Sequence, residues 1–309
     1  MGRVTLDPSG VPHQMQADPA MQELETAFLR KEVIKGHFID LKNDSGGPEK
    51  TICYVKYKSK KIVVPLHQMG IEFDNENNGM HQENEWVRRN QIANSMLGCE
   101  VDVIIVGIDK DNDTGRPIIA GSRTEAMRKQ RYKYFFASDP IINDKVDESE
   151  ARVISVAKQS IRVEFFGVEQ IIRMTDLCWT WIHDVRKNFH VGDIIGVKIM
   201  NREIDPATRT VKLELSHKEL FDNPAPEAFM NMEENRSCCV GTVTRITDGT
   251  YWPVFVGLEN GANVVCYQTR IKEVANEGDT IKVFIKHIDY KHGTANGAIV
   301  AIVQRNEEE

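Results

Sequence analysis

The sequence predicts a mainly β protein, built from three tandem five-stranded barrels with short connecting helices. Three observations predict this fold. One strand pattern recurs three times along the 309 residues, a polar turn and a further strand follow each copy, and the segments between copies have a different character. An internal repeat constrains the fold strongly, because each copy must be one supersecondary unit.

The recurring strand follows a glycine and carries apolar residues at alternate positions. Such a period of two is typical of a strand with one buried face. The glycines that open the strand, Gly98, Gly192 and Gly278, are 94 and 86 residues apart, which sets the length of the repeat. The three copies are Gly98–Ile105, Gly192–Ile199 and Gly278–Ile285.

A polar turn and a second strand complete a closing hairpin in every copy. The turns open on Asp109, Asp205 and Asp289, and residues of this type favour turn conformations. Five antiparallel strands in roughly 70 residues bury a core by coiling into a barrel, which also removes exposed edges. The strands after the turns are 117–120, 211–215 and 298–303, and the upstream meanders are 33–41 with 51–64, 151–156 with 161–172, and 240–246 with 252–265.

The segments outside the barrels predict helices and a linker. Apolar residues at helical spacing occur within 18–36, residues 122–136 predict a basic helix, and residues 221–235 predict a proline-containing linker that ends in a short helix. The predicted organisation is an N-terminal segment with a helix (1–30), a first barrel with a polar insertion (31–122), a basic helical connector (123–148), a second barrel (149–220), a linker (221–235) and a third barrel (236–305).

The composition is that of an ordinary soluble globular protein. Apolar residues make up 41% and charged residues 28% of the chain. Because the formal net charge is −7, a nucleic-acid-binding surface would have to gather its basic residues locally. The six cysteines show no zinc-ligand spacing, and neither a signal peptide nor a membrane span of about 18 apolar residues is recognisable. We therefore expect a cytoplasmic protein with reduced thiols, no metal, no cofactor and no membrane association.

The repeat resembles a known family. The resemblance rests on the Gly-Asp-x-[Ile/Val]-x-Val-x-Ile strands, the aspartate turns and the run Val-Lys-Leu-Glu-Leu-Ser-His-Lys-Glu-Leu over 211–220. These features resemble the S-one RNA-binding domain, an OB-fold named after a ribosomal small-subunit protein. The resemblance is good over 150–220, fair over 236–304 and weaker over 31–124.

The resemblance implies a barrel that lays single-stranded RNA across one exposed sheet face. Aromatic, histidine and basic side chains would make the contacts, since bases stack on aromatic planes and cations neutralise phosphates. The partners implied are single-stranded RNA and the ribosome or another ribonucleoprotein, and the role implied is in translation or RNA metabolism.

The second barrel departs from the family pattern at two positions. Arg162 stands where the family has phenylalanine, and Arg173 stands where it has histidine. Two arginines side by side on a sheet repel unless an anion lies across them, and RNA phosphate is one such anion. Alternatively, both are solvated and paired with Glu164 or Glu169.

The first barrel has Pro65 at the histidine position, but its second strand is the most lysine-rich in the chain. Period-two spacing predicts that Lys56, Lys58 and Lys60 share one face of this strand. The alternative is an ordinary charged outer face. The candidate RNA contacts here are Lys56, Tyr57, Lys58, Lys60 and Lys61.

In the third barrel the histidine position falls near Cys266. Tyr251, Trp252 and Tyr267 are close to it along the chain, and they could form a platform on which bases stack. Aromatic residues at strand starts also commonly belong to the core, so the two interpretations remain open.

The basic connector has two compatible interpretations. Arg128 and Arg131 could follow a phosphate backbone. The helix could equally be a rigid spacer that packs Met127, Tyr134 and Phe135 between the first two barrels.

No pattern of a known catalytic site is recognisable. A phosphate-binding loop, a Gly-x-Ser-x-Gly turn and a His-Glu-x-x-His helix are all missing from the sequence. The acidic run after Asp109 resembles part of a calcium loop, but Ser122 or Arg123 stands where its glutamate would be, so a polar hairpin explains it better.

The sequence therefore predicts a non-enzymatic protein that binds single-stranded RNA. The alternative is a protein-interaction or assembly module whose barrels have lost RNA binding. The acidic net charge and the missing phenylalanine and histidine residues favour that alternative.

Overall fold

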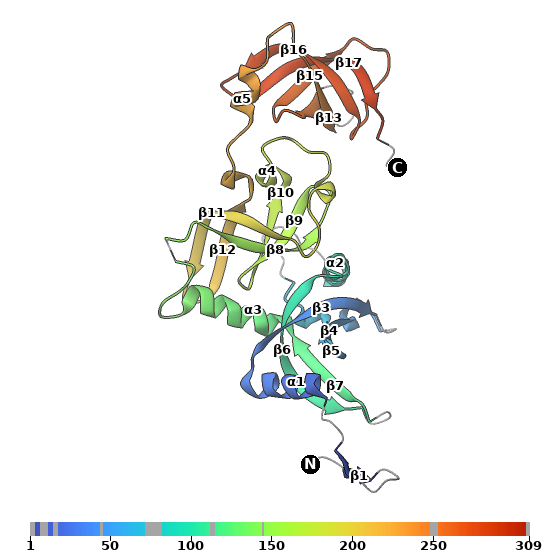
Figure 1. The fold of residues 1–309 in the computed structure, drawn as a ribbon, viewed down its shortest axis with the longest axis vertical. Helices are drawn as coiled ribbons and strands as arrows, with labels where there is room; N and C mark the ends of the chain where they lie inside the picture. The colour runs from blue at the N-terminus through green and yellow to red at the C-terminus, as the bar shows by residue number, and fades with distance from the viewer. Residues whose placement is uncertain are drawn as a thin grey trace. The chain divides into compact units, whose positions relative to one another are not determined.

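The structure is a computed structural model that describes residues 4–6, 12–14, 18–43, 46–71, 82–111, 115–143, 145–247 and 253–306. Two barrels are closed and a third five-stranded sheet is nearly so, with short helices between them (Figure 1). The predicted fold class is confirmed. The chain packs as two compact units, 1–141 with the turn 166–169, and 142–165 with 170–309. The sequence-based boundaries of the barrels remain a proposal.

The first barrel closes in the order β3-β4-β5-β7-β6. Its closing contact is a parallel pair in which Ile62 lies opposite Ile119. Alternate side chains such as Phe38 and Val55 point inward and are fully buried, as the period-two pattern predicts. The strands are β3 (Val33–Lys42), β4 (Ile52–Tyr57), β5 (Lys60–Pro65), β6 (Glu100–Lys110) and β7 (Pro117–Ser122).

Helix α1 (Pro19–Arg30) begins at an aspartate cap, because Asp18 Oδ1 accepts a hydrogen bond from Ala20 N at 3.0 Å. It packs against β6 through its buried face, including Leu24 (Figure 1). Helix α3 (Arg123–Arg131) begins at Ser122 and continues into the π-helical turn η3 (Tyr132–Phe136), so the predicted basic helix is present. The same compact unit contains β1 (Val4–Leu6), β2 (Pro12–Gln14), η1 (Pro48–Lys50), η2 (Leu66–Gln68) and α2 (Gln82–Ser95).

Helix α2 was not predicted from the sequence. Its segment is strongly polar, and the few apolar residues, such as Trp86 and Ile92, do not form a continuous stripe. The polar insertion predicted around 74–84 lies largely outside the described residues.

The second barrel forms a sheet in the order β10-β9-β8-β11-β12. Among the residues that the structure describes, no ladder joins its outer strands β10 and β12, so this barrel is open where the other two are closed. The strands are β8 (Glu148–Val156), β9 (Ser160–Phe165), β10 (Val168–Arg173), β11 (Ile194–Asp205) and β12 (Thr210–Ser216), accompanied by α4 (Met174–Leu177), η4 (Val185–Lys187) and η5 (Lys218–Leu220).

The third barrel closes in the order β13-β14-β15-β17-β16, again through a parallel pair, β15 with β17. The short helix α5 (Ala225–Met230) places Phe229 in its core. The strands are β13 (Cys238–Ile246), β14 (Val254–Leu258), β15 (Asn263–Thr269), β16 (Thr280–Asp289) and β17 (Thr294–Gln304).

The glycines that define the repeat occupy the same backbone conformation in every barrel. Gly98, Gly192 and Gly278 have φ angles of 87°, 98° and 86°. Side chains other than glycine rarely adopt this region, so the turn before β6, β11 and β16 requires a glycine. The recurring sequence therefore reflects a recurring turn.

Candidate nucleic-acid interface

The lysine-rich segment of the first barrel is a hairpin and not one strand. Strand β4 ends at Tyr57, Lys58 adopts a left-handed φ of 51°, and β5 begins at Lys60. Tyr57 pairs with Lys60, and Lys56 pairs with Lys61. The prediction that Lys56, Lys58 and Lys60 share a strand face is wrong, because the turn interrupts the alternation. The two turn residues, Lys58 and Ser59, lack the glycine or asparagine that usually marks such a turn.

Carboxylates at the start of α1 bind the tip of this hairpin. Lys58 pairs with Glu23, and the Lys60 ammonium lies 2.5 Å from Asp18 Oδ2. The Tyr57 hydroxyl donates a hydrogen bond to Glu23 Oε2 at 2.9 Å. The hydrogen bond from Lys58 holds the pKa of Glu23 below its usual value, and the bond from Lys60 does the same for Asp18. An external anion would have to compete with these carboxylates for the hairpin tip.

The outer face of the same strands presents cations around an aromatic ring. The ammonium groups of Lys42 and Lys61 each lie 5.8 Å from the centroid of the Tyr54 ring, within the range of a cation–π interaction. Lys56 is exposed, and it lies opposite Lys61 on one side and His37 on the other. We call this surface the cationic face; it consists of His37, Lys42, Tyr54, Lys56 and Lys61.

Three members of the cationic face were missed from the sequence. Tyr54 could have been found, because it lies two residues before Lys56 along β4 and therefore points to the same face of the strand. His37 and Lys42 belong to β3, and only the strand register brings them beside β4. Like charges directly opposite each other are unfavourable in a sheet, so an anion across Lys56 and Lys61 would relieve repulsion.

The connector helix contributes mainly packing. Met127 and Phe135 are buried, and the Tyr134 ring stacks on Phe166 with centroids 4.3 Å apart. Arg131 donates to the Gly167 carbonyl from Nε and Nη2, at 3.2 and 3.1 Å. The exposed Arg128 pairs with Glu125 at 2.8 Å. All these contacts lie within the first compact unit, and they agree with the spacer interpretation.

A buried ion pair at the start of the same helix was not predicted. Arg123 Nη1 lies 2.6 Å from Glu169 Oε1, and both side chains are almost completely buried. Arg123 also donates to the Met69 carbonyl at 2.7 Å. Its position directly after a strand gave no signal of burial, because charged residues are rarely fully buried.

The two arginines of the second barrel lie on neighbouring strands. Arg162 is half-buried on β9, and Arg173 is exposed at the end of β10. Glu169 pairs with Arg123, and Glu164 lies opposite Arg152 of β8. Both interpretations of Arg162 and Arg173 therefore remain predictions.

In the third barrel, Tyr267 projects from a bulge. The pairing of β15 with β17 shifts between Cys266 and Gln268, and Tyr267 is 58% exposed. Cys266 is buried, and burial raises its thiol pKa to about 12, so it remains protonated. The Arg270 guanidinium lies 4.2 Å from the centroid of the Phe284 ring, a contact that the sequence did not reveal. Tyr251 and Trp252 lie outside the described residues.

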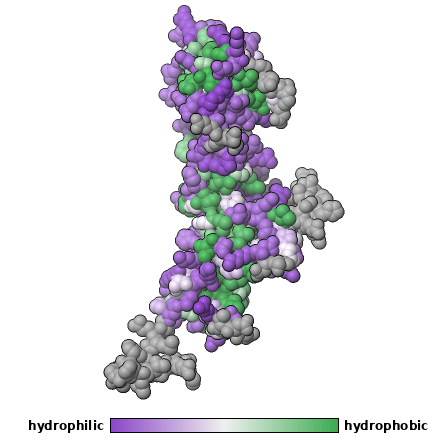
Figure 2. Space-filling model, turned by 90° about the vertical axis from the view of Figure 1, so that its right-hand side faces the viewer, coloured by the Kyte–Doolittle hydropathy of each residue, from purple (hydrophilic) through white to green (hydrophobic). Residues whose placement is uncertain are grey.

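Hydropathy alone does not single out one binding surface. Polar side chains dominate the face drawn in Figure 2, and smaller hydrophobic patches interrupt them. Within the described ranges, no cluster of three or more histidine, cysteine, aspartate or glutamate residues could hold a metal ion. None of the described helices is long and apolar enough to cross a membrane.

The chain is similar to the small ribosomal subunit protein bS1 of Coxiella burnetii (strain RSA 493 / Nine Mile phase I). The two are 22% identical over 202 residues, which cover 62% of this chain and 34% of the relative. The chain thus spans about a third of the length of the curated relative that it matches. No family model matches the chain.

Two solved structures are also similar. A multidomain protein with nucleic acid binding domains from Streptococcus pneumoniae TIGR4 is 13% identical, with 90% of this chain and 75% of that chain covered and a TM-score of 0.20. The a/eIF2alpha–aDim2p–rRNA complex from Pyrococcus horikoshii OT3 contains a chain that is 16% identical, with 27% and 49% covered and a TM-score of 0.21. At these TM-scores the likeness supports no conclusion about function.

Proposed function

We propose that this chain, a tandem S-one-type OB-fold protein, binds single-stranded RNA, and that the cationic face of the first barrel is its main contact surface. The arrangement of Lys42 and Lys61 around Tyr54 carries the proposal. It combines an aromatic plane with cations on one sheet face, which is what a flexible, negatively charged strand of bases requires.

The cationic face can contact both parts of a nucleotide. A base stacked on Tyr54 would contribute about 1–3 kcal/mol. Lys42, Lys56 and Lys61 would contact phosphates and release counterions, so the logarithm of affinity should fall with the logarithm of salt concentration with a slope of about −2. This cluster supplies locally the positive charge that a chain of net charge −7 lacks overall.

The other barrels would add weaker contacts. Tyr267 offers an exposed ring, and Arg173 offers an exposed guanidinium group, with the half-buried Arg162 on the neighbouring strand. Several weak sites on one chain raise overall affinity because binding at one site raises the effective RNA concentration at the next. We assign Lys58, Lys60, Arg128 and Arg131 lesser roles, because each is bound by the chain's own oxygens.

We further propose that the chain acts in translation or RNA metabolism in the cytoplasm, with the ribosome or another ribonucleoprotein as partner. The named relative is a ribosomal protein, which supports this setting. The proposal assigns no reaction to the chain. The contacts of the described residues add nothing to the sequence features that favour the alternative, an assembly module without RNA binding.

Fluorescence anisotropy with a labelled single-stranded oligoribonucleotide tests the proposal. The triple variant Lys42→Glu, Lys56→Glu, Lys61→Glu should lose about 100-fold or more in affinity and should flatten the salt dependence. The matched control is Lys110→Glu, which reverses an exposed charge at the far end of β6 and should change affinity less than twofold. Equal affinities of the triple variant and the wild type would refute the assignment of the cationic face.

A further inference from the structure

A loop of the second barrel is joined to the third barrel by side-chain and backbone hydrogen bonds. We call residues 179–188 the bridge; it lies with the third barrel in the second compact unit. Asn263 Oδ1 accepts from Trp181 N at 2.7 Å, and Asn263 Nδ2 donates to the Trp179 carbonyl at 2.9 Å. One amide side chain thus satisfies a donor and an acceptor of the bridge backbone.

The bridge approaches the third barrel as closely as a backbone can. A Cβ atom on Gly257 would lie 2.0 Å from the Trp181 carbonyl oxygen, so any other residue there would push the bridge away. The Trp181 ring packs edge-on against Phe255, with centroids 5.5 Å apart. Thr180 donates to the Gly261 carbonyl at 3.1 Å. The bridge therefore forms a fixed wall against β14 and β15.

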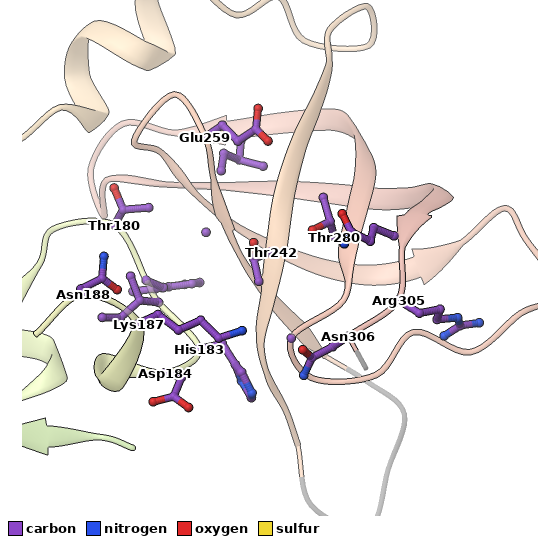
Figure 3. A pocket seen from close by; sticks show the side chains of 16 residues that line it. Thr180, His183, Asp184, Lys187, Asn188, Thr242, Glu259, Thr280, Arg305 and Asn306 are labelled. Carbon is purple, nitrogen blue, oxygen red and sulfur yellow. The ribbon is translucent and has the colours of Figure 1, made fainter. Parts of the chain in front are cut away.

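A polar cavity of about 380 Å³ lies between this wall and the barrel, and we call it the boundary cavity (Figure 3). Its volume falls in the range of small-ligand sites, about 300–1,000 Å³. Thr242 of β13 and Thr280 of β16 are direct cross-strand partners on its barrel side. Groups that line it and could contact a base, a sugar or a phosphate are Trp181, His183, Lys187, Thr242, Thr280 and Asn306.

The charges around the boundary cavity are not equivalent. Arg186 pairs with Asp184 at 2.5 Å, and its hydrogen bond holds the pKa of that carboxyl at about 2. Arg305 is likewise paired, with the buried Asp279 at 2.8 Å. The Lys187 side chain extends across the gap toward Thr242, whereas the Glu259 carboxylate points away from it (Figure 3). Lys187 of the bridge and Arg305 of the third barrel are thus the cationic side chains that line the cavity, and Lys187 is the one that extends across it.

We propose that the boundary cavity binds one nucleotide. The Trp181 and His183 rings would contact the base, Thr242 and Thr280 the sugar hydroxyls, and Lys187 the phosphate. The nucleotide could belong to a bound RNA strand, in which case the inference rests on the proposed function, or it could be a free mononucleotide. A nucleotide held there would make the second and third barrels one continuous binding surface.

Two-dimensional amide NMR of the full chain, titrated separately with adenosine or uridine monophosphate and with a single-stranded oligoribonucleotide, tests this proposal. We expect shifts of the amides of Thr242, Gly257 and Gly278, which line the cavity. Shifts with mononucleotide identify a free nucleotide as a ligand, and shifts with the oligonucleotide alone identify RNA. If neither probe shifts these amides, the proposal is wrong.

Substitutions of the bridge lysine complete the test. Lys187→Glu should weaken the binding that is read at these amides about tenfold, and Lys187→Arg should preserve it. Lys272→Glu is the matched control, since it reverses an exposed lysine of the third barrel that does not line the cavity. Equal effects of Lys187→Glu and Lys272→Glu would overturn the proposal. The two proposals can fail separately. If the triple variant keeps full RNA affinity while the cavity amides still shift, only the role of the cationic face is rejected.

Discussion

The tip and the outer face of the β4–β5 hairpin carry similar charge but differ in what neutralises it. At the tip, Lys58 and Lys60 are bound by carboxylates of α1. On the outer face, Lys56 and Lys61 lie opposite each other beside the Tyr54 ring, with no acidic partner among the described residues. The density of lysines in the sequence is the same for both regions, yet only the outer face presents its charge to a ligand.

The contrast shows that charge already bound by the chain stabilises the fold, whereas charge facing solvent is available for recognition. Arg123 is the extreme of the first kind, because its ion pair with Glu169 is almost completely buried. A buried charge that loses its partner cannot regain its hydration, so breaking such a pair is costly. Exposed pairs contribute little, because water screens them.

The largest expected effect therefore comes from Arg123. Arg123→Ala leaves Glu169 buried without its guanidinium partner and should lower the free energy of unfolding by about 3–5 kcal/mol. Chemical denaturation followed by circular dichroism measures this change.

The control for this experiment lies on the same helix. Arg128→Ala removes an exposed arginine and should change stability by no more than about 0.5 kcal/mol. If the two variants lose the same stability, the burial of the Arg123–Glu169 pair does not have the consequence argued above.

The barrels could be predicted from the sequence, but the partners of the charged residues could not. Gly98, Gly192 and Gly278 mark a turn that only glycine fills readily, and alternation then fixes which side chains are buried, so local rules suffice for the strands. Helix α2 was missed because its segment is polar, and the Lys58–Ser59 turn was missed because it lacks the usual turn residues.

The candidate site depends on contacts between distant segments. His37 joins Lys56 only through the β3–β4 register, and Glu23 reaches Lys58 only because α1 packs beside the barrel. The bridge meets Asn263 across more than 80 residues of chain. The alternation of side chains along β4 would have identified Tyr54, but no local pattern encodes these longer-range pairs.

The role of the aromatic ring gives the second prediction. Tyr54→Ala should weaken binding of single-stranded RNA about 10- to 100-fold, because a stacked base loses about 1–3 kcal/mol. Tyr54→Phe keeps the plane and should remain within about threefold of wild type, which separates stacking from any contribution of the hydroxyl. Fluorescence anisotropy at fixed salt measures both. If Tyr54→Ala binds RNA as tightly as the wild type, no base stacks on this ring, and the cationic face contacts RNA through its charges alone.

The third prediction changes the hairpin tip into a second exposed cluster. The double variant Asp18→Asn, Glu23→Gln removes the carboxylates that bind Lys60 and Lys58, so RNA affinity should rise about two- to fivefold and its salt dependence should steepen. Glu25→Gln is the matched control, because it removes one exposed negative charge from the same helix. If Glu25→Gln raises affinity as much as the double variant, net charge and not the hairpin tip accounts for the change.

The smallest expected effect is the pH dependence of the same contacts. The pKa values of Asp18 and Glu23 are lowered in the folded protein, chiefly by hydrogen bonds from Lys60 and Lys58. A carboxyl with a lowered folded-state pKa stabilises the fold above its unfolded-state pKa, and this contribution is lost as the pH falls through the folded-state value. The difference in thermal midpoint between wild type and the double variant should therefore shrink as the pH falls from about 6 to about 3. A difference that stays constant over this range would mean that the ionised carboxylates do not hold the hairpin tip, and the contrast between tip and face would then rest on geometry alone.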